Sequence, residues 1–145
     1  YGTRVPFFGY RLSQGDTPRP GEVVIFDSPE NGIRLIKRIV AVGGDRVSLK
    51  SGVLYLNGES PRVDSEEDTT VEVFGDRVAR LNMHYGGGPD IHHRRIRPGQ
   101  VLVVGDSRGN SRDGRFFGLI DQSILYGRAD RVIYRKNEGL VWKPL

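Results

Sequence analysis

Short runs of β-branched and aliphatic residues, each closed by turn-forming residues, recur along most of this chain. The runs are EVVIF (22–26), RLIKRIVAV (34–42), RVSLK (46–50), VLYLNG (53–58), TTVEVF (69–74) and RVARLNMH (77–84). The first two flank the turn formers DSPENG, and the last two flank Gly75-Asp76, so both pairs are typical of β-hairpins. Almost no segment has helical periodicity. We therefore predict an all-β fold, built as folded antiparallel sheets or a partly open barrel.

The rest of the chain adds few elements to this plan. The Gly-rich and then basic segment at residues 85–100 predicts a loop with a flexible middle. DQSIL (121–125), with Asp121 as N-cap and Gly127 as a stop, predicts a short helical turn near 121–126. RADRVIYR (128–135) predicts a closing strand. A length of 145 residues fits one domain spanning 1–145.

Composition narrows the function classes. The chain has no cysteine, which excludes disulfides and thiolate metal sites. Its 22 Lys+Arg against 18 Asp+Glu give a net charge of +4, spread along the chain, and this does not point to nucleic acid. No apolar stretch approaches the roughly 20 residues that span a bilayer. We expect a soluble piece of protein that binds no nucleic acid.

The histidines and the basic run HHRRIR (92–97) are candidate ligand sites. His92 and His93 lie near Asp90, but adjacent side chains on an extended segment point in opposite directions, and His84 belongs to another element. We therefore expect no metal and no cofactor. The basic run fits either a phosphate-binding patch or a solvated loop, and the second is favoured because no aromatic platform accompanies it.

Lys37 is the residue that stands out within a strand. Alternation places it on one face with Leu35 and Ile39. A lysine between two large aliphatic side chains can be desolvated, which lowers its pKa and lets the neutral amine activate a hydroxyl nucleophile. The alternative is a lysine at a sheet edge whose stem covers apolar surface while its ammonium stays in water.

A second polar feature is GDSRGNSRDGRFFG (105–118), which directly follows the apolar run VLVV (101–104). On its own it is either a support for an active site or a Gly-rich turn with surface ion pairs of little energetic value. Together with GEVVIF (21–26), LIKRIVAVGGDRVSL (35–49), LYLNG (54–58) and GRADRVIYR (127–135), it resembles the bacterial type I signal peptidases. These are membrane-bound Ser-Lys enzymes that remove signal peptides from exported proteins. The resemblance covers nearly the whole chain and is weakest around residues 60–96, where it implies a variable hairpin and loop insertion.

The resemblance implies roles for particular residues. Lys37 matches the catalytic general base, and Ser111 matches the serine whose hydroxyl orients that lysine. Ile36 matches a position that lines the substrate pockets, although a plain core isoleucine would give the same pattern. The matched polar supports are an ion pair, Asp113 with Arg115, and two further side chains, Asp106 and Arg108.

Three departures from the family pattern are visible. Gly109 stands where the family usually has Asp, and Gly114 where it usually has Ser, which predicts a less rigid loop. The family's nucleophile lies in an upstream Ser-Met-x-Pro-Thr stretch, and the chain contains none. Ser13 lacks that context and is interpreted as a loop residue. We expect the chain as given to be inactive, either because the nucleophile was truncated or because the natural protein never had one.

The resemblance also implies partners and a location. The precursor's signal-peptide region would bind as an extended strand, and a membrane anchor would precede Tyr1, with this domain on the extracytoplasmic (periplasmic) side. VPFFGY (5–10) would contact the bilayer surface or pack into the core. Three alternatives remain: a catalytically silent peptide-binding scaffold, a conjugation-pilus peptidase and a self-cleaving DNA-binding repressor. The absence of a DNA-reading helix and the long Asp/Arg motif disfavour the last.

Overall fold

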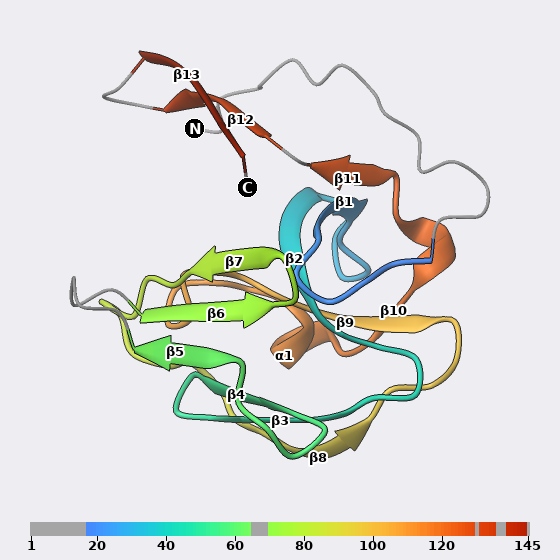
Figure 1. Cartoon of the computed structure of the whole chain (residues 1–145). Coiled ribbons are helices and arrows are strands. Elements are labelled where there is room, and N and C mark those ends of the chain that lie inside the picture. The colour runs from blue at the N-terminus through green and yellow to red at the C-terminus, as the bar shows by residue number, and fades with distance from the viewer. Residues whose placement is uncertain (1–16, 65–69, 130, 136–138, 145) are drawn as a thin grey trace.

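The computed structural model describes residues 17–64, 70–129, 131–135 and 139–144, and almost all of its regular structure is β-strand (Figure 1). This confirms the expected all-β fold. The strands are β1 (Val23–Asp27), β2 (Arg34–Val42), β3 (Arg46–Lys50), β4 (Val53–Leu56), β5 (Arg62–Asp64), β6 (Thr70–Phe74), β7 (Arg77–Arg80), β8 (Ile91–Arg95), β9 (Gln100–Val104), β10 (Ile120–Asp121), β11 (Gly127–Ala129), β12 (Arg131–Arg135) and β13 (Gly139–Pro144). Two short helical pieces accompany them, α1 (Gly114–Phe117) and the 3-10 turn η1 (Gln122–Ile124).

A five-stranded antiparallel sheet with the order β10-β9-β2-β1-β11 forms the centre of the molecule. The predicted hairpin of β1 and β2 is confirmed, with Val24 opposite Lys37. On its other side β2 pairs with β9, and the register shifts between Ile39 and Ala41. β2 is therefore an interior strand, so its side chains can be shielded by neighbours on both sides.

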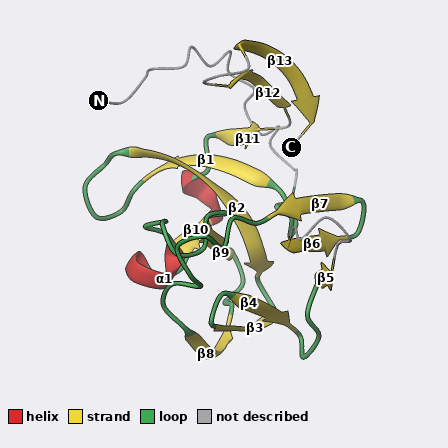
Figure 2. Ribbon diagram, turned by 90° about the vertical axis from the view of Figure 1, so that its left-hand side faces the viewer, coloured by secondary structure: helices red, strands yellow, loops and turns green. Residues whose placement is uncertain are grey.

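Three smaller sheets surround this centre, with the orders β4-β3-β8, β5-β6-β7 and β12-β13 (Figures 1 and 2). The β3–β4 hairpin turns through Ser51 and Gly52, both with positive φ, as a tight two-residue hairpin turn requires. The predicted hairpin around Gly75-Asp76 is confirmed as β6 and β7.

Two clusters of buried apolar side chains hold the sheets together. The larger one joins the central sheet to β3, β4, β6 and β7, and it includes Val40, Leu49, Leu54, Phe74 and Leu102. The smaller one lies on the other face and includes Val24, Phe26, Ile39, Val103 and Ile120. β9 contributes to both clusters, because its alternate side chains point to opposite faces. The polar segment that follows β9 thus extends from the best-buried strand of the fold.

The segment 85–100 departs from the expected loop, because it contains β8. Ile91 and Ile96 are buried at the two ends of this basic strand and fix it against β3, so the polar residues between them follow as an exposed stretch of strand. Helix α1 was not predicted either. Its four residues follow the N-cap Asp113, whose side chain accepts a hydrogen bond from Arg115 N.

The C-terminal expectations are met in part. The predicted turn is η1, and the Asp121 side chain caps it through Ser123 N. The predicted closing strand is found as β11 and β12, on either side of residue 130, and β13 follows as an addition. Ser13 and residues 5–10 lie outside the described residues. Within the described ranges, no helix combines the length and apolarity needed to cross a bilayer.

Candidate active site

Lys37 lies near the middle of β2 with its side chain half-buried. On the same face, Ile39 is buried in the core and Leu35 packs partly against it, as alternation predicts. Burial lowers the pKa of the Lys37 ammonium, and the nearby Asp113 carboxylate opposes this effect. Because β2 is flanked by β1 and β9, Lys37 is not an exposed edge residue. Its amine is therefore easier to deprotonate than an ordinary lysine.

The Ser111 hydroxyl is buried and has no hydrogen-bond partner. It packs against Gly105 so closely that a side chain at position 105 would overlap it. Gly105 follows Val104, which pairs with Arg38, the neighbour of Lys37. In this structure no hydrogen bond joins Lys37 Nζ to Ser111 Oγ. The Ser111 hydroxyl is close enough to Asp113 to help lower the pKa of that carboxyl group. The contact between Lys37 and Ser111 that the resemblance implies stays a prediction.

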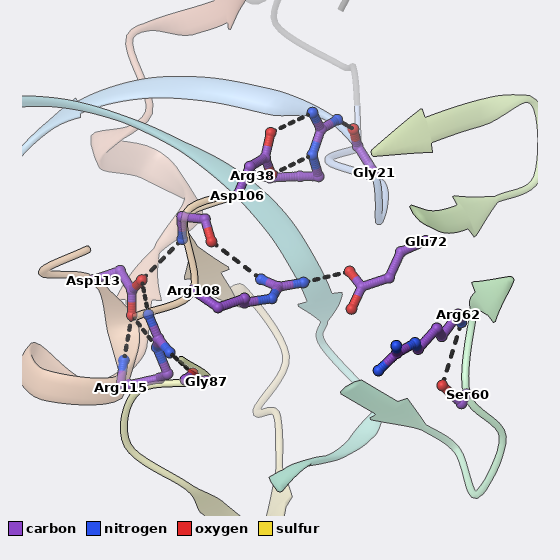
Figure 3. A network of polar contacts seen from close by, with 11 residues as sticks. Gly21, Arg38, Ser60, Arg62, Glu72, Gly87, Asp106, Arg108, Asp113 and Arg115 are labelled. Carbon is purple, nitrogen blue, oxygen red and sulfur yellow. Dashed lines mark hydrogen bonds and ion pairs between the residues drawn. The ribbon is translucent and has the colours of Figure 1, made fainter. Parts of the chain in front are cut away.

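Asp113 organises the segment that carries Ser111 (Figure 3). Its buried carboxylate accepts hydrogen bonds from Gly105 N at 2.8 Å and from Arg115 Nε and Nη2 at 2.8 and 2.9 Å. Burial alone would raise the pKa of Asp113, but the Arg115 guanidinium and the Gly105 N–H hold that pKa below its usual value. The carboxylate thus ties both ends of the segment 105–115 together.

Glycines 86–88 pack against this segment and do not form an open loop. Gly87 O accepts a hydrogen bond of 2.7 Å from Arg115 Nη1, and any side chain at Gly88 would overlap the Arg115 guanidinium. A side chain at Gly87 would overlap the backbone of Ser51. The middle of the segment 85–100, which was expected to be a flexible loop, therefore packs closely against other backbone. Glycine suits such close approach as well as it suits a flexible loop.

Asp106 binds a residue that the sequence analysis did not single out. Arg38 donates to the two carboxylate oxygens of Asp106 at 2.9 and 2.8 Å, and to Gly21 O at 2.7 Å. Arg38 is only 4% exposed, although alternation places it on the opposite face from Lys37. The only sequence signal was its position beside Lys37 in an interior strand. The pair links β2 directly to the start of the polar segment.

Arg108 forms a second buried ion pair, with Glu72 of β6. The Arg108 side chain also donates to Gly105 O at 3.3 Å. Glu72 was missed, although it shares a face of β6 with the core residue Phe74, which is an unusual place for a carboxylate. Figure 3 shows that Asp106 connects the segment to Arg38 of β2 and Arg108 connects it to Glu72 of β6, whereas Asp113 binds within the segment.

Gly109 and Gly114 occupy positions where this fold leaves no room for a side chain. A Cβ at Gly114 would lie 2.7 Å from Leu102 Cδ1 and 2.8 Å from Val103 O. One at Gly109 would overlap the carbonyl of Tyr85. The contacts that larger residues could make are here replaced by direct backbone packing.

Ile36 lies opposite Ile25 in the β1–β2 hairpin. Its side chain is 45% exposed, so it is not a core isoleucine. An exposed aliphatic residue beside the half-buried Lys37 is compatible with a substrate contact, and that role stays a prediction.

The fold and the polar segment together define a β-domain in which the half-buried Lys37 lies in the strand next to β9, and β9 leads into the segment that carries the buried Ser111. Residues 5–134 match the family model described as signal peptidase, peptidase S26. The chain belongs to this family.

Individual relatives agree with this assignment. The chain is 31% identical over 121 residues to signal peptidase I of Bacillus licheniformis, covering 81% of this chain and 60% of that protein. It is 32% identical over 110 residues to signal peptidase IB of Staphylococcus aureus, covering 74% and 56%. The chain thus spans about 60% of the length of these curated relatives. A crystal structure of a signal peptidase I from Enterococcus faecalis V583 has the same fold, with a TM-score of 0.57, 23% identity and coverage of 79% of this chain and 97% of that one.

Proposed function

We propose that the complete protein is a serine endopeptidase that removes signal peptides from exported precursors, with neutral Lys37 as general base. One observation supports this most directly. In a chain of the signal peptidase family, a half-buried lysine of lowered pKa lies in the strand next to a segment that carries a buried, unpaired Ser111 hydroxyl. A neutral amine can accept a proton from a hydroxyl without any histidine.

The proposed reaction has two steps. A serine hydroxyl attacks the scissile carbonyl while Lys37 Nζ takes its proton, and the proton then passes to the amine that leaves as the C–N bond breaks. The same amine next deprotonates a water, which hydrolyses the acyl-enzyme ester and releases the carboxylate. Ser111 orients Lys37, and the ion pairs of Asp113 and Asp106 fix the segment. The nucleophile belongs to a Ser-Met-x-Pro-Thr stretch that is not among these 145 residues, so this proposal concerns the complete protein.

The proposed substrate is the region around the cleavage site of a precursor, bound as an extended strand. Ile36 would help to line shallow pockets for small residues at the first and third positions before the cut. The proposed location is the extracytoplasmic side of the bacterial cytoplasmic membrane, with an anchor that precedes this domain. Both proposals are supported by the family membership and by the resemblance of the motifs.

The function can be tested by incubating the complete protein with a signal-peptide-bearing precursor and sequencing the N-terminus of the product. We expect one cut after a small residue, and no cut when that residue is replaced by tryptophan. The 145-residue chain alone is expected to leave the precursor intact. Tight binding of the precursor without cleavage by the complete protein would contradict the proposal and favour a silent scaffold.

Replacing Ser111 by alanine in the complete protein is expected to lower kcat by about 10²-fold, because Lys37 loses the group that orients it. In the proposed contact the Ser111 hydroxyl accepts a hydrogen bond from the ammonium form of Lys37, so its loss disfavours that form. The acid-side midpoint of the pH–rate profile should therefore move to lower pH. Ser107→Ala, which removes a hydroxyl from the same segment, should change neither quantity. An unchanged midpoint in Ser111→Ala would show a role in folding alone.

A further inference from the structure

A hollow of about 330 Å³ lies on the surface beside the start of β9. Its walls come from two segments that are distant in sequence, the end of β8 with the following turn and the end of α1. The lining residues are Arg94, Arg95, Arg97, Gln100, Phe117, Gly118 and Leu119. Three of these seven lining residues are thus arginines.

An irregularity in β8 directly precedes the arginines that line the hollow. Val47 of β3 pairs with Arg94 and Leu49 pairs with Ile91, so β8 carries one extra residue between these pairs. His93 sits in this bulge with φ of 39°, and its N–H donates to Ser48 Oγ at 3.2 Å. Bulges of this kind redirect side chains. Arg94 and Arg95 follow the bulge in register with Val47 and Arg46, and both residues line the hollow.

The turn after β8 adds the third arginine. Gln100 N donates to Arg97 O at 3.1 Å, and Gly99 between them has φ of 77°. With Pro98 before it, Gly99 satisfies the requirements of a type II turn. The turn is therefore fixed by its own sequence, and it holds Arg97 and Gln100 at one rim of the hollow.

Gly118 forms the opposite wall. It ends α1 with φ of 87°, a conformation that favours glycine. A Cβ at this position would lie 3.7 Å from Arg94 Nη2, so the Arg94 guanidinium lies directly over the helix end. The absence of a side chain at position 118 keeps the space in front of Arg94 open.

The positive charge of the hollow is not neutralised by the protein. Within the described ranges, the guanidinium groups of Arg94, Arg95 and Arg97 form no hydrogen bond or ion pair. Asp45, which follows β2, accepts hydrogen bonds from Val42 N and Asn57 Nδ2. Asp121, opposite Gln100, accepts one from Ser123 N. Three like charges that share one cavity repel one another, and an anion placed among them would remove this cost.

The hollow is separate from the candidate active site. It lies at the Gln100 end of β9, whereas the segment that carries Ser111 follows Val104 at the other end. Four residue steps along a strand span roughly 13 Å. Occupation of the hollow can therefore be measured without reference to peptide cleavage.

We propose that this hollow is a binding site for a phosphate group, held by the guanidinium groups of Arg94, Arg95 and Arg97. Planar guanidinium forks match phosphate oxygens in a bidentate way, and three of them supply enough donors to surround one phosphate. Of the two interpretations of the run 92–97, the cavity thus favours the phosphate site over the solvated loop. The phosphate can belong to a soluble compound or to an anionic phospholipid headgroup.

The test compares two double variants with the same loss of charge. Arg94→Gln/Arg97→Gln alters the hollow, whereas Lys50→Gln/Arg80→Gln alters exposed cations outside it. At one fixed ionic strength, each chain is titrated with inorganic phosphate by calorimetry. Each is also sedimented with phosphatidylcholine vesicles, with and without phosphatidylglycerol. Both variants lower the net charge by two, so general attraction to anions falls equally in both.

The unaltered chain is expected to bind inorganic phosphate, phosphatidylglycerol vesicles or both. In that assay Arg94→Gln/Arg97→Gln should bind at least about tenfold more weakly. The control variant should stay within about twofold of the unaltered chain. Binding of inorganic phosphate identifies a soluble phosphate as sufficient, and binding only to phosphatidylglycerol vesicles identifies the lipid headgroup. Equal weakening in the two variants, or no binding in either arm, would overturn the proposal.

Discussion

Substituting Lys37 by alanine in the complete protein is expected to lower kcat by about 10²–10⁴-fold, the usual contribution of a positioned general base. The reason is the environment of the side chain: burial within β2 lowers the pKa of Lys37, so its neutral form is easier to reach than that of an exposed lysine. By contrast, Lys50 at the end of β3 is exposed. Precursor cleavage under single-turnover conditions provides the measurement.

The pH dependence follows from the same shift. The protonated amine cannot accept a proton, so activity is low at acid pH and rises as Lys37 loses its proton. Because its pKa is lowered from the ordinary 10.5, the midpoint of this rise should lie below 10.5. The variant Lys37→Arg distinguishes a role as general base from a role as positive charge, since arginine keeps the charge but cannot act as a base. It should be as inactive as Lys37→Ala, whereas Lys50→Ala should be fully active. Substantial cleavage by Lys37→Arg would rule out the proposed base.

The parts of the fold that sequence predicted well are those specified by local chemistry. The hairpins of β1 with β2 and of β6 with β7 follow from apolar runs that end in turn formers, and the 3-10 turn follows from its Asp121 cap. β8 was not predicted as a strand, because four of its five side chains are polar and exposed and form no apolar run. Only its pairing with β3 and the burial of Ile91 and Ile96 specify it as a strand, and pairing between distant segments is not visible in a local pattern.

The candidate site divides in a similar way. Lys37 could be recognised from the alternation of its neighbours, and the matching motif indicated Ser111, Asp113 and Arg115. Arg38 and Glu72 could not be found in this way, because a charged residue in a strand usually faces solvent. Each can be buried because it forms an ion pair with a residue far along the chain, Arg38 with Asp106 and Glu72 with Arg108. The glycines of the segment 85–100 were also ambiguous in the sequence, because glycine is suited both to flexible loops and to places where two backbones pack closely.

Replacing Glu72 by alanine is expected to lower the free energy of unfolding by about 3–5 kcal/mol, because it leaves Arg108 as a buried charge without its partner. Glu72 is 0% and Arg108 1% exposed, so water cannot replace the lost carboxylate without opening the fold. For a domain of this size the change corresponds to a melting temperature roughly 10 °C lower. Thermal and urea unfolding of the 145-residue chain would provide both values. Glu30→Ala, which removes the exposed partner of Arg112, is the matched control and should change stability little.

A second variant distinguishes the cost of an unpaired charge from the loss of packing. Glu72→Leu/Arg108→Met replaces both partners by apolar side chains of similar volume, so no buried charge remains. Its stability should return close to that of the unaltered chain, or exceed it. Arg108 also donates to Gly105 O, next to the Ser111 hydroxyl, so the double variant should lose precision in the active-site segment while keeping the fold. In the complete protein we therefore expect cleavage to fall although the melting temperature is restored. A double variant as unstable as Glu72→Ala would mean that packing, and not the unpaired guanidinium, determines the loss.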